Sequence, residues 1–224
     1  MKKIAIPGWS LGDSSFGVTK PYLEYFSQFG QVEILTPRKD IVKTDLIVMP
    51  GGLDVNPLDF NEVPSFNTSN TDVYKNYFFK QNLPQYIQNG TPIFGICLGM
   101  QQLAVYFGSK LNQHLLYHPY YSNPRTELVH ELYKVNIKNN EITVESPKKK
   151  GEKGKIEVNS LHHQGVELDK LSDKLIPTYV SDNYPEYLVE AFVHVNYKIS
   201  AVQWHPEEIY DIYSINEIKR LLDE

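Results

Sequence analysis

The stretch PIFGICLGMQ, residues 92–101, decides the fold of this chain, and it contains Cys97, the only cysteine. Its first residues are apolar and typical of a buried strand, whereas the segment from Met100 to Phe107 is compatible with a helix. Gly95 and Gly99 flank the cysteine in a G-x-C-x-G pattern, in which glycines permit a sharp strand-to-helix turn. The pattern predicts a nucleophile held at a helix N-terminus, where negative charge is favoured and thiolate is promoted.

Strand-like and helical segments alternate through the rest of the first half. We expect strands at 3–6, 32–35 and 46–49, helices at 19–29 and 71–89, and a long loop at 53–70. This β-α-β-β-α-β order predicts an α/β fold with a mostly parallel sheet and helices on both faces. Ligands of such sheets bind at the carboxyl ends of strands, which is where Gly51, Gly52 and Cys97 fall.

The second half is richer in β-structure. We expect strands at 132–137, 141–145, 155–158, 188–193 and 199–203, and a closing helix at 214–222 with Ser214 as its N-cap. The lysine-rich segment 146–155 is typical of a solvated hairpin tip. With no repeat and no linker, residues 1–224 are predicted to form a single domain.

The bulk composition excludes several classes of function. A formal net charge of -5 over 224 residues gives no reason to expect a nucleic-acid partner. No apolar run approaches the roughly 20 residues that span a bilayer, so we expect no membrane association. The N-terminal segment MKKIAIPGW is interrupted by a proline and a glycine, which favours a first strand over a signal peptide. A single cysteine fits a reducing compartment, and we expect the protein to be cytoplasmic.

A cysteine nucleophile needs a base and a group that orients the base. The segment AVQWHPEE supplies His205 and Glu207 directly after a predicted strand. If Pro206 holds this segment extended, both side chains point to the same side. Glu207 would then accept a hydrogen bond from one nitrogen of His205 while the other faces Cys97, giving nucleophile, base and orienting carboxylate.

Acyl transfer also needs donors for the developing oxyanion. The backbone N–H of Leu98, which follows the nucleophile, is one candidate. The N–H of Gly52, or of its neighbour Leu53, is the second, because a glycine-rich turn lets the backbone approach a substrate closely.

These residues resemble the class I glutamine amidotransferase superfamily. Three motifs carry the resemblance: PGG at 50–52, GICLGMQ at 95–101 and VQWHPE at 202–207. The resemblance implies a flavodoxin-like three-layer α/β sandwich and no cofactor. It also implies the following site residues: catalytic Cys97, His205 and Glu207, oxyanion donors Gly52 and Leu98, and substrate-binding Gln101.

Three further segments are similar to the γ-glutamyl hydrolase-like branch, peptidase family C26. They are GGLDVNP at 51–57, VNSLHHQGV at 158–166 and LVEAF at 188–192. This likeness implies that Ser160, His162, His163 and Gln164 lie near a γ-glutamyl pocket; the alternative is a polar loop that caps the sheet. The two adjacent histidines have no third ligand at a suitable spacing, so no metal is predicted.

The chain departs from that branch at two places. Leu98 stands where an arginine often follows the cysteine, and Thr71-Asp72-Val73-Tyr74-Lys75 replaces an R-D-x-x-E pattern. These departures affect substrate identity and leave the thiol chemistry untouched.

The sequence thus favours a hydrolase of γ-glutamyl amide bonds that forms a γ-glutamyl thioester on Cys97 and acts on a small-molecule substrate. One alternative is a glutaminase subunit that supplies ammonia to a separate synthetase chain, since no G-x-x-x-x-G-K-[ST] motif is present. A second is a non-catalytic binding or regulatory protein. Tyr117, Tyr120 and Tyr121 are candidates for core packing or a loop surface, or alternatively for a specificity wall around the leaving amine. The identity of that amine and the oligomeric state stay open.

Overall fold

The computed structural model describes residues 1–38, 40–116, 118, 124–138, 141–145, 155–183 and 185–223. Residues 146–154 of the predicted hairpin tip at 146–155 lie outside these ranges, as do the three tyrosines Tyr117, Tyr120 and Tyr121. None of the helices in the described ranges is long and apolar enough to cross a membrane.

Strands and helices follow one another along the chain as follows. The strands are β1 (Lys3–Pro7), β2 (Trp9–Ser10), β3 (Phe16–Gly17), β4 (Gln31–Leu35), β5 (Leu46–Met49), β6 (Ile93–Ile96), β7 (His130–Lys138), β8 (Glu141–Val144), β9 (Lys155–Val158), β10 (Val166–Glu167), β11 (Leu175–Asn183), β12 (Glu186–His194) and β13 (Ile199–Val202). The α-helices are α1 (Lys20–Phe26), α2 (Val73–Tyr77), α3 (Leu83–Gln88), α4 (Leu98–Tyr106), α5 (Pro206–Ile209) and α6 (Ile212–Asp223). Two 3-10 turns, η1 (Pro57–Phe60) and η3 (Leu168–Lys170), and the π-turn η2 (Phe78–Asn82) complete the set.

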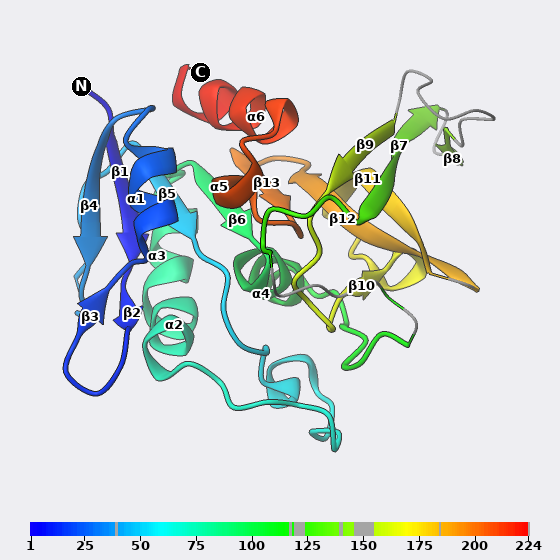
Figure 1. Ribbon diagram of the computed structural model, residues 1–224, viewed down its shortest axis with the longest axis horizontal. Helices are drawn as coiled ribbons and strands as arrows, with labels where there is room; N and C mark the ends of the chain where they lie inside the picture. The colour runs from blue at the N-terminus through cyan, green and yellow to red at the C-terminus, as the bar shows by residue number, and fades with distance from the viewer. Residues whose placement is uncertain are drawn as a thin grey trace.

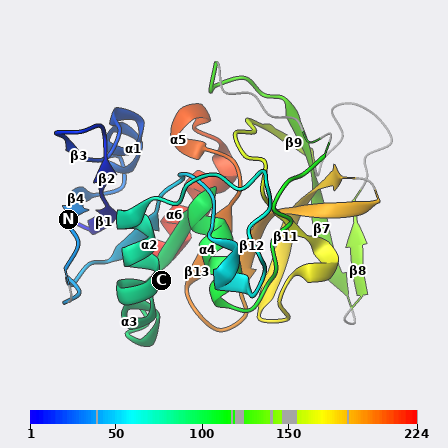
Figure 2. The same cartoon turned by 90° about the horizontal axis from the view of Figure 1, so that it is seen from below.

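One large sheet runs through both halves of the chain, in the order β4-β1-β5-β6-β13-β12-β11-β7-β8 (Figure 1). The first five of these strands are parallel. From β12 onward the pairs are antiparallel, and Figure 2 shows β7, β8, β9 and β11 gathered on the side away from β1 and β4. The expected α/β fold, with a parallel centre and a β-rich second half, is confirmed.

Alternate residues of the parallel strands pack into two separate layers of core. Ile4, Leu46 and Phe94 pack with aromatic residues of α1 and with α6 on one face of the sheet. Ala5 and Ile47 pack on the other face with η2, α3 and α4. Strands covered on both faces are apolar throughout, as β5 and β6 are here, so the three-layer arrangement follows from the sequence pattern.

Two of the expected helices differ in detail. The segment predicted as one helix over 71–89 is divided into α2, η2 and α3, with a π-turn in its middle. Ser214 is not the N-cap of the last helix but a buried residue inside α6. The backbone N–H of Ser214 instead donates to Oδ1 of Asp211 at 2.8 Å, so an acidic side chain caps this end.

Candidate active site

Cys97 lies at the junction between β6 and α4, as the elbow pattern predicts. Its backbone adopts φ 49° and ψ -106°, a conformation that non-glycine residues rarely occupy, and it is the N-cap of α4. A side chain at Gly99 would come within 2.2 Å of the carbonyl oxygen of Met49, so the second glycine of the pattern lets α4 pack against β5. Strain of this kind persists only where the surrounding structure imposes it, and it concentrates at functional sites.

His205 and Glu207 meet beside Cys97. His205 Nδ1 lies 2.6 Å from Glu207 Oε1, and both side chains are buried. The prediction that they reach each other from an extended segment is wrong, because Pro206 and Glu207 begin α5 and His205 is its N-cap. A proline is well accommodated at this first helical position, so the contact forms across a helix start.

The charge state of His205 follows from its neighbours. Burial disfavours the charged ring, but the charges of Glu207 and Cys97 and the hydrogen bonds to both outweigh burial and raise the pKa of His205 to about 10. At neutral pH this arrangement favours an imidazolium between a carboxylate and the sulfur.

Asn159 fixes the backbone of His205 from the other half of the fold. Its Oδ1 accepts the N–H of His205 at 2.9 Å, and its Nδ2 donates to the carbonyl of Arg125 at 2.7 Å. Asn159 directly precedes the predicted Ser160–Gln164 segment, but the sequence analysis did not select it. The only signal was its place in the VNSLHHQGV motif.

The Pro50-Gly51-Gly52 turn is packed tightly around the same centre. A side chain at Gly51 would lie 2.6 Å from Cε1 of His205, so the ring occupies the space that glycine leaves. The N–H of Gly51 donates to the hydroxyl of Tyr22 at 2.8 Å. At Gly52 a side chain would meet Leu98 Cδ2 at 2.7 Å. Gly52 and Leu98, whose N–H groups are the two predicted oxyanion donors, therefore lie next to each other in space.

Lys75 is a buried cation that the sequence analysis noted only as a departure from a family pattern. Its Nζ donates to the carbonyl of Gly51 at 2.6 Å and lies 3.9 Å from the centroid of the Trp9 ring. Burial lowers the pKa of Lys75 to about 8, against the charges of Asp72 and Cys97, which favour the ammonium. Lys75 thus ties the turn to α2 and places positive charge near the thiol.

A cavity of about 250 Å³ opens next to Cys97. It is lined by Gly52, Leu53, Asp54, Ser69, Cys97, Gln101, Leu161, His162, His163 and Gln164. Four of the five predicted substrate-binding residues therefore line it. The fifth, Ser160, is not among the lining residues, and its Oγ instead lies 3.2 Å from Nε2 of His118.

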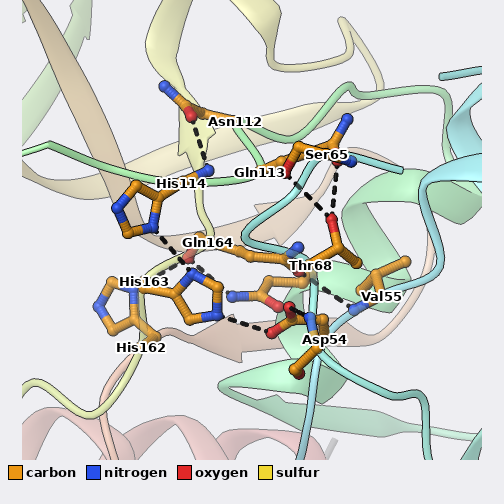
Figure 3. A network of polar contacts seen from close by, with 12 residues as sticks. Asp54, Val55, Ser65, Thr68, Asn112, Gln113, His114, His162, His163 and Gln164 are labelled. Atoms are coloured by element: carbon orange, nitrogen blue, oxygen red, sulfur yellow. Dashed lines mark hydrogen bonds and ion pairs between the residues drawn. The ribbon is translucent and has the colours of Figure 1, made fainter. Parts of the chain in front are cut away.

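A chain of polar contacts builds the wall of this cavity (Figure 3). His163 lies between Asp54 and His114, with Nε2 3.0 Å from Asp54 Oδ1 and Nδ1 3.3 Å from His114 Nδ1. Gln164 accepts the N–H of Val55 at 3.1 Å through Oε1. Its carbonyl also accepts a bond from Nε2 of Gln101 at 2.9 Å. The loop after β5, the loop after β9 and α4 are joined here into one surface.

Among the described residues, one group has the donor types of a metal site: His118, His130, His162 and Glu190. His162 is shared with the cavity wall, whereas the other three residues come from distant parts of the chain. Because these residues are far apart in the sequence, a ligand pattern of short spacing could not identify them.

Comparisons with known proteins place this geometry in context. A family model described as Peptidase C26 matches residues 28–207. The glutamine amidotransferase-like protein YvdE of Lactococcus lactis is 29% identical over 196 residues, covering 83% of this chain and 78% of that protein. The γ-glutamyl-γ-aminobutyrate hydrolase PuuD of Escherichia coli is 31% identical over 137 residues, covering 59% of this chain and 52% of that protein.

The fold also has counterparts among solved structures. A glutamine amidotransferase from Thermotoga maritima superposes with a TM-score of 0.55 at 16% identity, covering 99% of this chain and 89% of that one. At this identity the likeness concerns the fold alone.

Proposed function

Because the chain belongs to the peptidase C26 family, we propose that it is a cysteine-dependent hydrolase that cleaves γ-glutamyl amide bonds and releases glutamate. One observation carries the proposal: a strained Cys97 at the start of α4 beside a His205 that is paired with Glu207 at 2.6 Å. Backbone strain and a shifted pKa, here about 10 for the buried His205, concentrate at catalytic sites, which supports an enzyme over a non-catalytic binding protein.

In the proposed reaction, the thiolate of Cys97 attacks the side-chain carbonyl carbon of the γ-glutamyl group. The imidazolium of His205 then gives its proton to the departing amine as the tetrahedral intermediate collapses to a thioester. The neutral ring next takes a proton from water, and the hydroxide adds to the thioester carbonyl. The C–S bond then breaks, which releases glutamate and restores the Cys97 thiolate beside the His205 imidazolium. Glu207 holds the ring in one orientation throughout.

The oxyanion of each tetrahedral intermediate would be held by the N–H groups of Gly52 and Leu98. The Leu98 N–H occupies the first helical position, where an N–H has no acceptor within its own helix. Lys75 supports the pair by holding the carbonyl of Gly51 at 2.6 Å, which fixes the orientation of the following peptide. Donors that are held in place before the reaction would stabilise the developing charge without the cost of reorganisation.

The polar wall of the cavity suits the amino-acid part of a γ-glutamyl substrate. Asp54 offers a carboxylate to an α-ammonium group, and the contact of its Oδ1 with His163 Nε2 at 3.0 Å holds that carboxylate in place. The relative named γ-glutamyl-γ-aminobutyrate hydrolase supports the same substrate class.

The test is glutamate release by the purified chain alone, from L-glutamine and from a panel of γ-glutamyl amines and γ-glutamyl peptides. We expect turnover of at least one γ-glutamyl amide well above that of glutamine, and none with Cys97→Ala. The preferred member of the panel identifies the leaving amine.

Two outcomes would overturn the proposal. Slow hydrolysis of glutamine alone would favour a glutaminase subunit that acts with a synthetase chain. Equal glutamate release by the wild type and Cys97→Ala would exclude the cysteine mechanism.

A further inference from the structure

Three histidines and one glutamate from four distant segments converge behind the wall of the cavity. Glu190 lies in the middle of β12, His130 begins β7, His162 lies in the loop after β9, and His118 comes from the segment that follows α4. The four side chains can each offer one ligand atom, and these atoms all lie within 4.8 Å of one another. Glu190 has no exposed surface at all, and His130 and His162 are buried.

Hydrogen bonding within the group leaves several of its atoms unsatisfied. His118 Nδ1, His130 Nδ1 and Glu190 Oε2 are buried and have no hydrogen-bond partner among the described residues. Buried polar atoms are rarely left unpaired, because each unpaired atom loses its interaction with water. His130 Nδ1 and Glu190 Oε2 each lie within 4 Å of another member of the cluster, so these two unpaired atoms point to an occupant that is not part of the chain. His118 directs Nε2, not Nδ1, toward His162.

The spacing of the side chains suits a tetrahedral ion. Four ligands at bond lengths of about 2.0–2.1 Å lie roughly 3.4 Å from one another. Here Nε2 of His118 and Nε2 of His162 are 3.1 Å apart. Glu190 has Oε1 3.6 Å from His130 Nδ1 and Oε2 3.9 Å from His162 Nε2. All four ligand atoms lie within 4.8 Å of one another, so the longest separation would shorten by up to about 1.4 Å on binding.

Supporting hydrogen bonds already orient two of the ligands. A carbonyl oxygen can only accept, so the 2.9 Å contact between His162 Nδ1 and the carbonyl of Gln164 places the proton on Nδ1. With the proton on Nδ1, the ring presents the lone pair of Nε2 to the cluster, 3.1 Å from His118 Nε2 and 3.9 Å from Glu190 Oε2. The hydroxyl of Ser181 donates to Glu190 Oε1 at 2.8 Å and fixes that carboxylate. Bonds of this type are the usual partners of metal-ligating residues.

Three imidazoles and one carboxyl group make up the cluster. Neutral imidazole nitrogens with one carboxylate oxygen, in a closed site, form a donor set that suits Zn²⁺.

We propose that His118, His130, His162 and Glu190 bind one Zn²⁺ ion per chain as a structural site. The ion would join β7, β12, the loop after β9 and the segment after α4. Its consequence for the cavity runs through His162, because the same Gln164 carbonyl that holds this ring also accepts the bond from Gln101. The site does not depend on the proposed activity, since Cys97 is not a ligand.

The test uses the full chain without an affinity tag, stripped with a chelator and dialysed. Titration with Co²⁺, as a coloured substitute for Zn²⁺, reports both stoichiometry and geometry. We expect one Co²⁺ per chain with the intense visible bands of a tetrahedral site, displacement of this colour by one equivalent of Zn²⁺, and a higher Tm with Zn²⁺ than without.

Matched variants assign the ligands. Glu190→Gln and His130→Asn should each weaken Co²⁺ binding by tenfold or more. Two controls should bind as the wild type does. They are His194→Asn, which makes the same change four residues from Glu190 on β12, and Cys97→Ala, which removes the only thiol.

X-ray absorption of the wild-type Zn²⁺ complex keeps the proposal testable if a ligand variant fails to fold. The expected spectrum has nitrogen and oxygen neighbours at about 2.0–2.1 Å and no sulfur. A sulfur neighbour, equal binding by Glu190→Gln and the wild type, or no binding beyond that of a non-specific surface site would each overturn the proposal.

Discussion

Oδ1 of Asn159 accepts the backbone N–H of His205 at 2.9 Å, and this bond joins the antiparallel half of the fold to the candidate catalytic base. Nδ2 of the same side chain donates to the carbonyl of His205 at 3.3 Å. One buried amide therefore satisfies both backbone groups of the residue whose ring must face Cys97.

Asn159→Ala should lower kcat with little effect on KM, because His205 loses its anchor while the cavity wall stays in place. An unmade buried hydrogen bond costs about 1–3 kcal/mol, and the same cost in the transition state corresponds to a decrease of about 5- to 150-fold. Steady-state kinetics with the preferred γ-glutamyl amide measures the change. Asn196→Ala, at an exposed position between β12 and β13, is the control and should behave as the wild type.

Lys75→Met should change the response of the enzyme to alkaline pH. The pKa of Lys75 is lowered to about 8, so the wild type loses this positive charge as pH rises through 8, and the hold on Gly51 weakens. We expect wild-type kcat/KM to fall between about pH 7 and 9. Lys75→Met should be less active at pH 7 and should lack this fall.

Alkylation of the only thiol provides a check that needs no substrate. Iodoacetamide should modify Cys97 more slowly in Lys75→Met than in the wild type at pH 7, because the variant lacks the positive charge near the sulfur. Equal alkylation rates for Lys75→Met and the wild type at that pH would mean that Lys75 acts only by holding the carbonyl of Gly51, without an electrostatic effect on Cys97.

Gly51→Ala should abolish most activity although the change is a single methyl group. The added carbon would lie 2.6 Å from Cε1 of His205, so the ring must move away from Cys97. Gly17→Ala is the matched control, because its added carbon would meet Leu11 at an ordinary 3.6 Å. Thermal unfolding of both variants separates displacement of the ring from loss of the fold, and a fully active Gly51→Ala would show that the ring has room elsewhere.

The elements that follow from local pattern were predictable from the sequence. Hydrophobic runs located β1, β5 and β6, and the G-x-C-x-G pattern located the elbow, because these features depend on neighbouring residues. The division of the 71–89 helix by a π-turn and the capping of α6 by Asp211 were missed. Both depend on small differences in local hydrogen bonding that several side chains could satisfy.

The contacts that complete the site were not predictable, because they join segments far apart in sequence. Asn159 reaches His205 across 46 positions, and His163 reaches Asp54 across 109. The cluster around Glu190 is the clearest example, since no spacing rule relates its members. Motifs could name His162 as a site residue, but only the paired strands bring His130 and Glu190 to it.

Asp54→Asn should raise KM for the preferred γ-glutamyl amide more than it lowers kcat. Asp54 Oδ1 lies 3.0 Å from His163 Nε2, and Asp54 Oδ2 accepts the N–H of Ser69 at 2.6 Å. The carboxylate therefore supplies negative charge to the cavity wall and also holds two of its segments together. Asparagine keeps the size of the side chain but removes the negative charge that we assign to binding an α-ammonium group. A second substrate tests this assignment: the increase in KM caused by Asp54→Asn should largely disappear for an analogue that lacks the α-amino group. An equal loss for both compounds, or a fall in kcat at unchanged KM, would place Asp54 in positioning the catalytic residues rather than in binding.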